Sequence, residues 1–239
     1  MPDEPQILAR VSARNIWLEE AHAWAHWAGQ GDDGFSEFRR LLPGPGRATL
    51  DLGCGEGRFS RELAAAGHRV TGVDVSPDLV ELAQAADPTG TYLVADAKSL
   101  PFAEATFDLV VAFNVLSCVD DLERGVGEVA RVLTAGGRVC FSIVHPMYTG
   151  GRRRDDSWVI DAGYMDERLH TERVRRGEAE LTFANIHRPL GAYTGALERA
   201  GLAIEGDARA GLGARADVPL HAGGEAVSGA EHWEGEAER

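Results

Sequence analysis

Short apolar runs alternate with amphipathic stretches from residue 47 to about residue 144. Most of these runs are rich in β-branched or aromatic residues and are continuous enough to be buried on both faces of a sheet. Such alternation is typical of parallel strands joined by crossover helices. It predicts an α/β fold with parallel strands at residues 48–52, 68–73, 92–94, 107–113 and 137–144.

Helix signals fill the segments between these strands. Residues 58–66 have helical character closed by Gly67, and Ser76 followed by proline marks the N-cap of the next helix. Apolar residues recur at helical spacing along residues 122–133, directly before a Gly-Gly pair, and predict a helix that ends in glycine. We expect these apolar positions to be core positions.

The segments on either side of the alternating region have other patterns. Tryptophan and alanine at helical spacing predict a helix over residues 15–28 that covers the sheet edge. Residues 146–186 are interpreted as an irregular, aromatic insertion that forms a lid over a site. A last helix is expected at residues 189–200, and a sixth strand at residues 202–204.

The end of the chain is rich in Gly, Ala and Glu and has few large apolar residues. It predicts only a weak strand at residues 218–220 and a disordered acidic tail from about residue 223. The expected organisation is a helical cap, one α/β domain that carries the lid, and a weakly structured acidic tail, at residues 1–46, 47–205 and 206–239.

Charge narrows the classes of partner. The formal net charge is −14 at pH 7, which repels polyanions and argues against a nucleic-acid substrate. The one basic cluster, at residues 152–154, is followed at once by two aspartates that cancel most of its field.

Other composition features argue against a membrane role, disulfides and metal. No apolar run approaches the roughly 20 residues that span a bilayer, and the N-terminal residues lack the pattern of a secretory signal, so we expect a cytoplasmic protein. The three cysteines lie far apart and outside any CxxC pair, which argues against a disulfide framework and a structural zinc site. His22 and His26 lie four residues apart without a third ligand nearby, so we assign no metal.

The strongest chemical signal is LDLGCGEG at residues 50–57, between an apolar strand and an amphipathic helix. Gly53 and Gly55 let the chain turn sharply and let its backbone approach a ligand. NAD enzymes use a similar loop, but their fingerprint has glycine at the sixth position, where this chain has Arg58. Asp51 ends the strand, where a buried charge needs a partner. S-adenosylmethionine is such a partner, because it carries both a sulfonium and an ammonium.

Two more carboxylates end the next strands. Asp74 follows the last glycine of the loop by 74 − 57 = 17 residues and can accept hydrogen bonds from both ribose hydroxyls. The alternative, that Asp74 only caps the following helix, is weaker because Ser76 is better placed for capping. Asp96 can accept from an exocyclic adenine amine, although taken alone an ordinary turn aspartate explains it equally well.

Four segments in order, LDLGCGEGR, GVDVSP, ADAKSLPFAEATFDLVVAFNVL and EVARVLTAGGRV, resemble the cofactor-binding motifs of class I S-adenosylmethionine-dependent methyltransferases, of the methyltransferase type 11 kind. The resemblance covers about residues 48–144. It implies a Rossmann-like three-layer sandwich with a mostly parallel central sheet and an N-terminal helical cap. It also implies a cofactor site for S-adenosyl-L-methionine that comprises Asp51, Gly53, Cys54, Gly55, Asp74, Val75, Asp96, Ala97, Asn114 and Leu116.

Within that site the resemblance implies that the two glycines line the methionine portion and that Asp51 holds its polar end. Asp74 then binds the ribose, Asp96 and Ala97 bind the adenine, and Asn114 with Leu116 closes the site. The flanks are similar to a bacterial subgroup that acts on small molecules, but that match is looser. The Gly/Ala/Glu-rich end stands where that subgroup has a further apolar strand.

The activity that the resemblance implies is methyl transfer to an O, N or C atom of a small molecule. His145 is the first candidate for a general base, because it follows the fifth strand at the end where open α/β sheets bind ligands. A structural loop histidine is an equal alternative, and His187 and Tyr148 are weaker candidates.

Two other functions remain open at this point. One is a catalytically silent S-adenosylmethionine-binding protein, and the other is an NAD-dependent oxidoreductase, against which Arg58 and Asp51 both argue. Trp24, Trp27 and Trp158 are large enough to form a lid over a ligand, although core packing is the better explanation for at least two of them.

Overall fold

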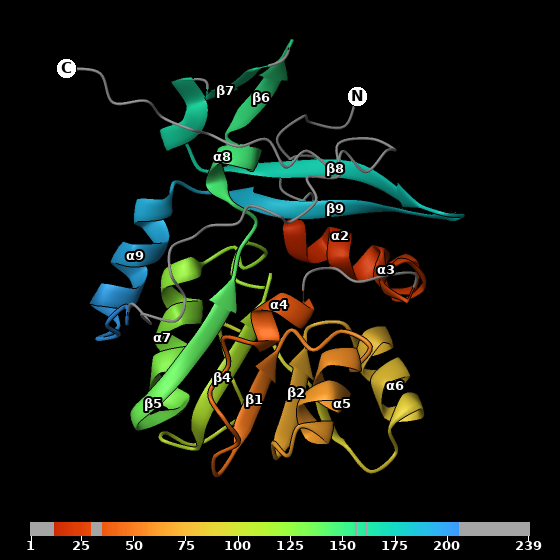
Figure 1. Ribbon diagram of the computed structural model, residues 1–239, viewed down its shortest axis with the longest axis vertical. Helices are drawn as coiled ribbons and strands as arrows, with labels where there is room; N and C mark the ends of the chain where they lie inside the picture. The colour runs from red at the N-terminus through yellow and green to blue at the C-terminus, as the bar shows by residue number, and fades with distance from the viewer. Residues whose placement is uncertain (1–11, 30–34, 156, 161, 206–239) are drawn as a thin grey trace, which may run out of the picture. The chain divides into compact units, whose positions relative to one another are not determined.

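Five parallel strands form the central sheet in the order β3-β2-β1-β4-β5 (Figure 1). A computed structural model describes residues 12–29, 35–155, 157–160 and 162–205, and all of these lie in the first of two compact units, residues 1–206 and 207–239. The strands are β1 Thr49–Leu52, β2 Val70–Asp74, β3 Thr91–Val94, β4 Phe107–Phe113 and β5 Leu133–Ser142. All four neighbouring pairs are parallel, which confirms the predicted α/β fold.

Helices cover both faces of this sheet, as a three-layer sandwich requires. They are α4 Phe35–Arg39, α5 Arg58–Ala65, α6 Pro77–Ala86, α7 Leu122–Val132 and α9 Leu190–Arg199. Alternate residues of a strand point to opposite faces. Val110 of β4 therefore packs in one core cluster with residues of α7 and α9, whereas Val111 packs in another with Phe38 of α4 and Leu63 of α5.

The junction between α7 and β5 differs from the prediction that this helix ends in glycine. Helix α7 ends at Val132, and β5 begins at the next residue. The Gly-Gly pair lies inside the strand. At this point the pairing passes from Phe107↔Leu133 to Leu109↔Arg138, so the chain advances by five residues along β5 and by only two along β4. Gly136 takes a φ of +75° in this bulge, a conformation that glycine adopts at little cost.

The predicted sixth strand at residues 202–204 is wrong, because these residues form no strand. The backbone N–H of Leu202 instead donates to Leu197 O and closes the end of α9. The weak strand and the acidic tail expected at residues 218–220 and from residue 223 lie outside the described residues.

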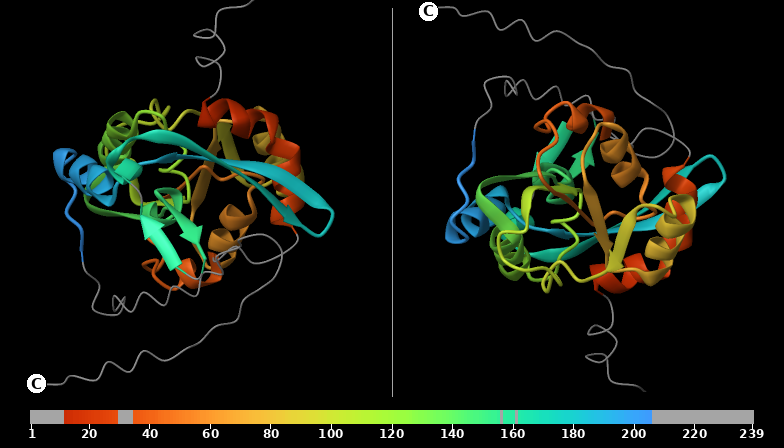
Figure 2. Two further views of the ribbon diagram at one scale, coloured as in Figure 1. Left: turned by 90° about the horizontal axis from the view of Figure 1, so that it is seen from above. Right: turned by 90° about the horizontal axis from the view of Figure 1, so that it is seen from below.

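The segment predicted to be an irregular lid is mostly ordered into two antiparallel hairpins. Its elements are α8 Pro146–Thr149, β6 Gly151–Arg154, β7 Ser157–Ile160, the 3₁₀ helix η1 Ala162–Met165, β8 Arg168–Arg176 and β9 Ala179–His187. Strands β8 and β9 pair without a break from Arg168↔His187 to Arg176↔Ala179. This β8–β9 ribbon lies across the end of the sheet at which the parallel strands finish (Figures 1 and 2).

Two helices take the place of the single helix predicted at residues 15–28. They are α2 Ala13–Glu19 and α3 Ala21–Ala28, with a break at Glu20. Both pack against β9, and α3 also contacts α6, so the N-terminal helices lie between the ribbon and the sheet (Figure 1). In the described part of the chain, no helix combines the length and the apolar character needed to cross a membrane.

Candidate functional site

The glycine loop after β1 turns sharply under the N-terminal helices. Gly53 and Gly55 have φ values of +70° and +57°, in the left-handed region that glycine adopts without strain. The N–H groups of Gly53 and Cys54 both donate to Val73 O, which fixes the loop to the end of β2. A Cβ added at Gly55 would lie 3.1 Å from the Trp24 Nε1 atom. The loop is therefore a tight cradle that a side chain at either glycine would disturb.

Asp51 lies beneath this cradle and is only 2% exposed. Burial, with the nearby charges of Asp74 and Glu56 as lesser causes, raises the pKa of Asp51 to about 7, although a hydrogen bond from Ser60 opposes the shift. The Ser60 hydroxyl donates to Asp51 Oδ2 at 2.6 Å. A buried carboxylate with a hydroxyl partner and carboxylate neighbours favours a cation in the space above it.

Asp74 ends β2 and connects the glycine loop to α6. Its Oδ2 accepts from the N–H of Gly55 at 2.9 Å, and its Oδ1 accepts from the N–H of Ser76 at 2.9 Å. Burial raises the pKa of this carboxyl. The Ser76 hydroxyl accepts from Leu79 N–H and caps α6, as the sequence predicted, so the Asp74 carboxylate remains available to a ligand's hydroxyl groups.

The third carboxylate, Asp96, lies beyond β3 and is about one-third exposed. Its Oδ1 accepts from Lys98 N–H at 2.9 Å, in the manner of a turn aspartate. Its Oδ2 lies 3.8 Å from Arg14 Nε and 3.8 Å from Lys98 Nζ. The contact with Arg14 connects α2 to the predicted adenine end of the site, and no motif in the sequence predicted it.

The remaining predicted cofactor residues contribute in different ways. Asn114 follows β4 with a φ of +57°, and its Oδ1 accepts from Ser142 Oγ at 3.0 Å. Leu116 is buried in the main core, and the side chain of Cys54 packs with Val80, Ala83 and Tyr92. These two side chains are core, so only their backbone can border a ligand. Val75 and Ala97 are partly exposed beside Asp74 and Asp96.

The two candidate histidine bases differ in exposure and in their hydrogen-bond partners. His145 is exposed, and its Nδ1 accepts from Met147 N–H as the N-cap of α8. His187 is buried, and its ring nitrogens contact Thr149 Oγ1 at 2.7 Å and Tyr164 O at 2.8 Å. Because a carbonyl only accepts, His187 Nε2 donates to Tyr164 and Nδ1 accepts from Thr149. Both nitrogens of His187 are thus engaged in structural hydrogen bonds.

An aromatic cluster joins the N-terminal helices to the ribbon. Phe183 of β9 makes edge contacts with Trp17, Trp24 and Trp27, at centroid distances of 5.4, 5.9 and 5.1 Å. The Trp17 indole N–H also donates to Ala184 O at 2.8 Å. Trp24 lies beside the glycine loop, whereas Trp27 is buried, which agrees with core packing for the latter. Trp158 belongs to another region, where it stacks on Tyr148.

Arg58 has a structural role that its position in the glycine motif did not reveal. Its Nη1 donates to Ala28 O at 2.7 Å. The residue that stands at the sixth position of the NAD fingerprint, in place of glycine, therefore connects α5 to the end of α3. The indole of Trp24 and the guanidinium of Arg58 together hold α3 over the loop.

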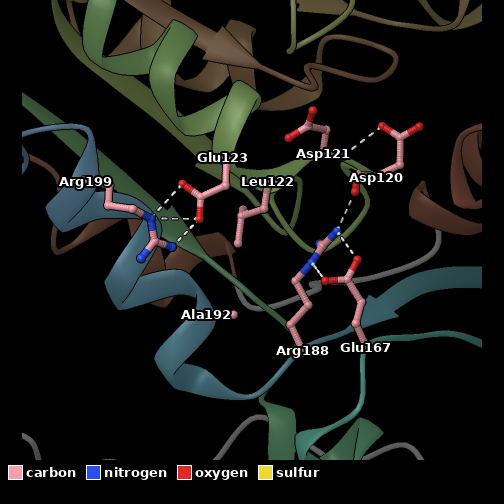
Figure 3. A pocket seen from close by; sticks show the side chains of 8 residues that line it. All are labelled: Asp120, Asp121, Leu122, Glu123, Glu167, Arg188, Ala192 and Arg199. Carbon is pink, nitrogen blue, oxygen red and sulfur yellow. Dashed lines mark hydrogen bonds and ion pairs between the residues drawn. The ribbon is translucent and has the colours of Figure 1, made fainter.

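A hollow of about 250 Å³ lies away from the glycine loop, between α7 and α9 (Figure 3). Its charged lining is largely paired: Arg188, only 2% exposed, binds Glu167 at 2.9 Å, and Arg199 binds Glu123. Arg188 Nη2 also donates to Asp120 O. None of the predicted site residues lines this hollow. We therefore interpret the paired charges around it as part of the structural support of α9.

The cradle and its carboxylates fit a ligand that carries a ribose and a cation. Asp51 supplies a buried negative charge below the loop, Asp74 supplies acceptor oxygens beside it, and the glycines leave room for close backbone approach. The structure brings together these residues with Asn114 at the carboxyl ends of β1, β2 and β4, where open parallel sheets bind ligands.

Comparisons with known proteins agree with this chemistry. Residues 50–141 match the family described as "Methyltransferase domain". The chain is 31% identical over 180 residues to the O-methyltransferase resE of Aspergillus sclerotiorum, a match that covers 70% of this chain and 68% of that protein. It is also 39% identical over 97 residues to a malonyl-[acyl-carrier protein] O-methyltransferase of Erwinia billingiae, with 41% of this chain and 39% of that relative covered.

A solved structure extends the similarity beyond the glycine loop. The S-adenosylmethionine-dependent methyltransferase of Mesorhizobium loti superposes with a TM-score of 0.62 at 31% identity, and the match covers 74% of this chain and 83% of that one. By contrast, the match with the malonyl-[acyl-carrier protein] O-methyltransferase spans about two fifths of that relative's length.

Proposed function

Because this chain belongs to the S-adenosylmethionine-dependent methyltransferases, we propose that it transfers the methyl group of S-adenosylmethionine to a small molecule. The observation that carries the proposal is the buried Asp51 carboxylate beneath a left-handed glycine loop, with Asp74 hydrogen-bonded to the N–H of Gly55. A cationic, ribose-bearing ligand satisfies both carboxylates, whereas a pyrophosphate placed above Asp51 would be repelled.

When bound, S-adenosylmethionine supplies a methyl carbon activated by a positively charged sulfur. The chain's own contribution is alignment and exclusion of water. In this proposal Asp74 holds the ribose, Asp51 holds the cationic end, and Asp96 borders the adenine. Trp24 is held by α3 and the aromatic cluster against the loop that lines this site.

Features of the chain support the remaining parts of the proposal. A net charge of −14 favours a small acceptor over a nucleic acid. Cys54, Cys118 and Cys140 are all free thiols, which is typical of a reducing compartment, so we propose that the protein acts in the cytoplasm.

Calorimetric titration tests the cofactor assignment. S-adenosylmethionine and S-adenosylhomocysteine should bind, and NADH should not. Asp74→Ala should weaken both by about 100-fold or more, because charged hydrogen bonds to the ligand and to the loop are lost together. Asp78→Ala is the matched control, since Asp78 lies on the exposed first turn of α6, and it should leave both affinities unchanged.

Two results would change the assignment. Binding of NADH alone would move the protein to the oxidoreductases. Binding of S-adenosylmethionine without methyl transfer to any member of a broad acceptor panel would favour the catalytically silent binding protein.

A further inference from the structure

The inward face of the β8–β9 ribbon is defined by alternation along β8. From residue 170 onward the exposure alternates: residues 170, 172, 174 and 176 are partly buried, whereas residues 171, 173 and 175 are exposed. Val174 packs with Trp27 in a core cluster, and the Arg176 guanidinium lies 3.7 Å from the centre of the Trp27 ring. The partly buried positions of β8 therefore face the N-terminal helices and the site beneath them.

His170 is on this inward face of β8. It is paired with Asn185 across the ribbon, and paired residues of antiparallel strands share a face about 5 Å apart. Asn185 Oδ1 accepts from Ser117 Oγ at 3.0 Å, and Ser117 Oγ lies 3.3 Å from Asn114 O. A short series of contacts thus leads from the cofactor residue Asn114 to His170.

The surroundings of His170 are polar and aromatic. Tyr148 of α8 lies 6.2 Å from it between ring centres, and the Tyr148 hydroxyl donates to Glu172 Oε2 at 2.6 Å. His170 Nε2 is buried and has no hydrogen-bond partner within the described part of the chain. A buried imidazole nitrogen without a partner is uncommon in proteins and needs an explanation.

The other described histidines near the ribbon are already engaged. His145 caps α8, and His187 uses both ring nitrogens in structural contacts. His170 differs from both, because it combines an unpaired nitrogen with a position on the face that covers the site.

We propose that His170 is the general base for an acceptor hydroxyl, an assignment that rests on the proposed methyl transfer. The acceptor O–H proton moves to His170 Nε2 while the oxygen forms a bond to the methyl carbon. The carbon–sulfur bond breaks, and its electron pair stays on sulfur. The products are a methyl ether, S-adenosylhomocysteine and a proton on His170, which then passes to solvent.

Electrostatics around His170 suit this role. Burial is the main cause that lowers the pKa of His170, with Arg168 and His187 acting in the same direction and Glu172 opposing them. The imidazole is therefore neutral near pH 7 and can accept a proton. Tyr148, which faces it from α8, is a neutral donor to Glu172 because burial raises its pKa.

The same surroundings indicate the class of acceptor. A base with a lowered pKa works best on an acidic hydroxyl, and the nearby Tyr148 ring offers a flat apolar face. The Glu172 carboxylate beside His170 disfavours an acceptor that is itself a carboxylate. A phenol meets all three conditions, and we assign the acceptor to this class.

A chromogenic phenol tests the assignment without turnover. The protein is saturated with S-adenosylhomocysteine and titrated with 4-nitrophenol at a pH at which the free phenol is mostly protonated. The phenolate absorbance should appear on binding to the natural protein and should fall at least tenfold in His170→Gln. Thr171→Gln, on the exposed face of the same strand, is the matched control and should behave like the natural protein. With a phenol that turns over, His170→Gln should lower kcat about 100-fold.

A second measurement needs no variant. In protein labelled with ¹³C at histidine Cε1, adding 4-nitrophenol to the S-adenosylhomocysteine complex should move one histidine signal to the imidazolium position. An unmoved set of signals, equal phenolate absorbance in His170→Gln, or no binding of 4-nitrophenol would overturn the proposal. Failure of S-adenosylhomocysteine itself to bind would instead overturn the proposed function.

Discussion

The glycine loop and the β8–β9 ribbon lie at the same end of the sheet (Figure 1) but are built from contacts of different range. Asp51 meets Ser60 nine residues away, and Asp74 meets Gly55 nineteen residues away. In the ribbon, Asn185 meets Ser117 across 68 residues and Ala184 meets Trp17 across 167. The comparison teaches that the proposed cofactor cradle is built from contacts within one short stretch of chain, whereas the ribbon depends on distant segments that come together only in the fold.

The largest expected effect comes from Asp51→Asn, which should raise the stability of the folded chain and at the same time weaken ligand binding at the loop. The pKa of Asp51 lies near 7 in the folded chain against an ordinary value of 3.8, a difference worth about 4 kcal/mol. The folded state keeps a proton between these two pH values that the unfolded state releases, so stability falls as the pH rises through this window and stays low above it. Asp51→Asn should therefore raise the free energy of unfolding by up to about 4 kcal/mol at pH 8 and by little near pH 4.

The same variant should lose affinity for S-adenosylmethionine. In the natural protein a cationic ligand favours ionised Asp51, so the affinity should rise with pH through about 7. Denaturant unfolding and calorimetry at both pH values measure the two effects. A variant that is less stable at pH 8, or that binds as tightly as the natural protein, contradicts this account.

The next effect belongs to the ribbon. Phe183→Ala removes the ring that touches three tryptophans and should lower the free energy of unfolding by about 3 kcal/mol. Thr171→Ala, at an exposed position of β8, is the control and should stay within about 0.5 kcal/mol. If the ribbon serves the acceptor, 4-nitrophenol binding should fall much more than S-adenosylhomocysteine binding. Equal losses of affinity for both ligands would show that the ribbon and the glycine loop do not serve different ligands.

A smaller effect is expected from Gly55→Ala. An L residue in the left-handed region costs about 1–2 kcal/mol, and the added Cβ presses on Trp24. The S-adenosylhomocysteine affinity should fall about tenfold or more, because the loop must shift. Gly127→Ala, in α7 with no other atom within 4 Å of the added Cβ, should instead raise stability by about 1 kcal/mol. A Gly55→Ala protein with unchanged affinity would show that the cradle tolerates movement.

The smallest effect tests the contact between the ribbon and the segment that follows β4. Ser117→Ala removes the hydroxyl that donates to Asn185 Oδ1 and should cost about 1 kcal/mol, because a buried acceptor loses its main donor. Hydrogen exchange should increase at the Ile186 amide, which donates to Ser117 O, while the glycine loop stays protected. Increased exchange in the loop as well would mean that the two regions open as one unit.

The difference in contact range between the glycine loop and the ribbon also explains which features the sequence could predict. The five strands of the central sheet, the loop, the Asp74 position and the Ser76 cap follow from local patterns, and all appear in the structure. The ribbon was predicted to be irregular, because the many charged residues of β8 hide a strand whose pairing depends on β9 and the helices below. The place of His145 after β5 is visible in the sequence, whereas the buried nitrogen of His170 is visible only in the fold, so His170 is not among the candidates that the sequence offers.

The alternation along β8 has a consequence for how such proteins diverge. Its outward positions, such as Thr171, Arg173 and Arg175, can drift during evolution without touching either ligand, while the positions between them face the site. If the ribbon contacts the acceptor as proposed, natural selection can alter acceptor choice by changing every second residue of one strand and leave the glycine loop intact. Relatives with the same loop and different inward residues are expected to have diverged in the molecules that they modify.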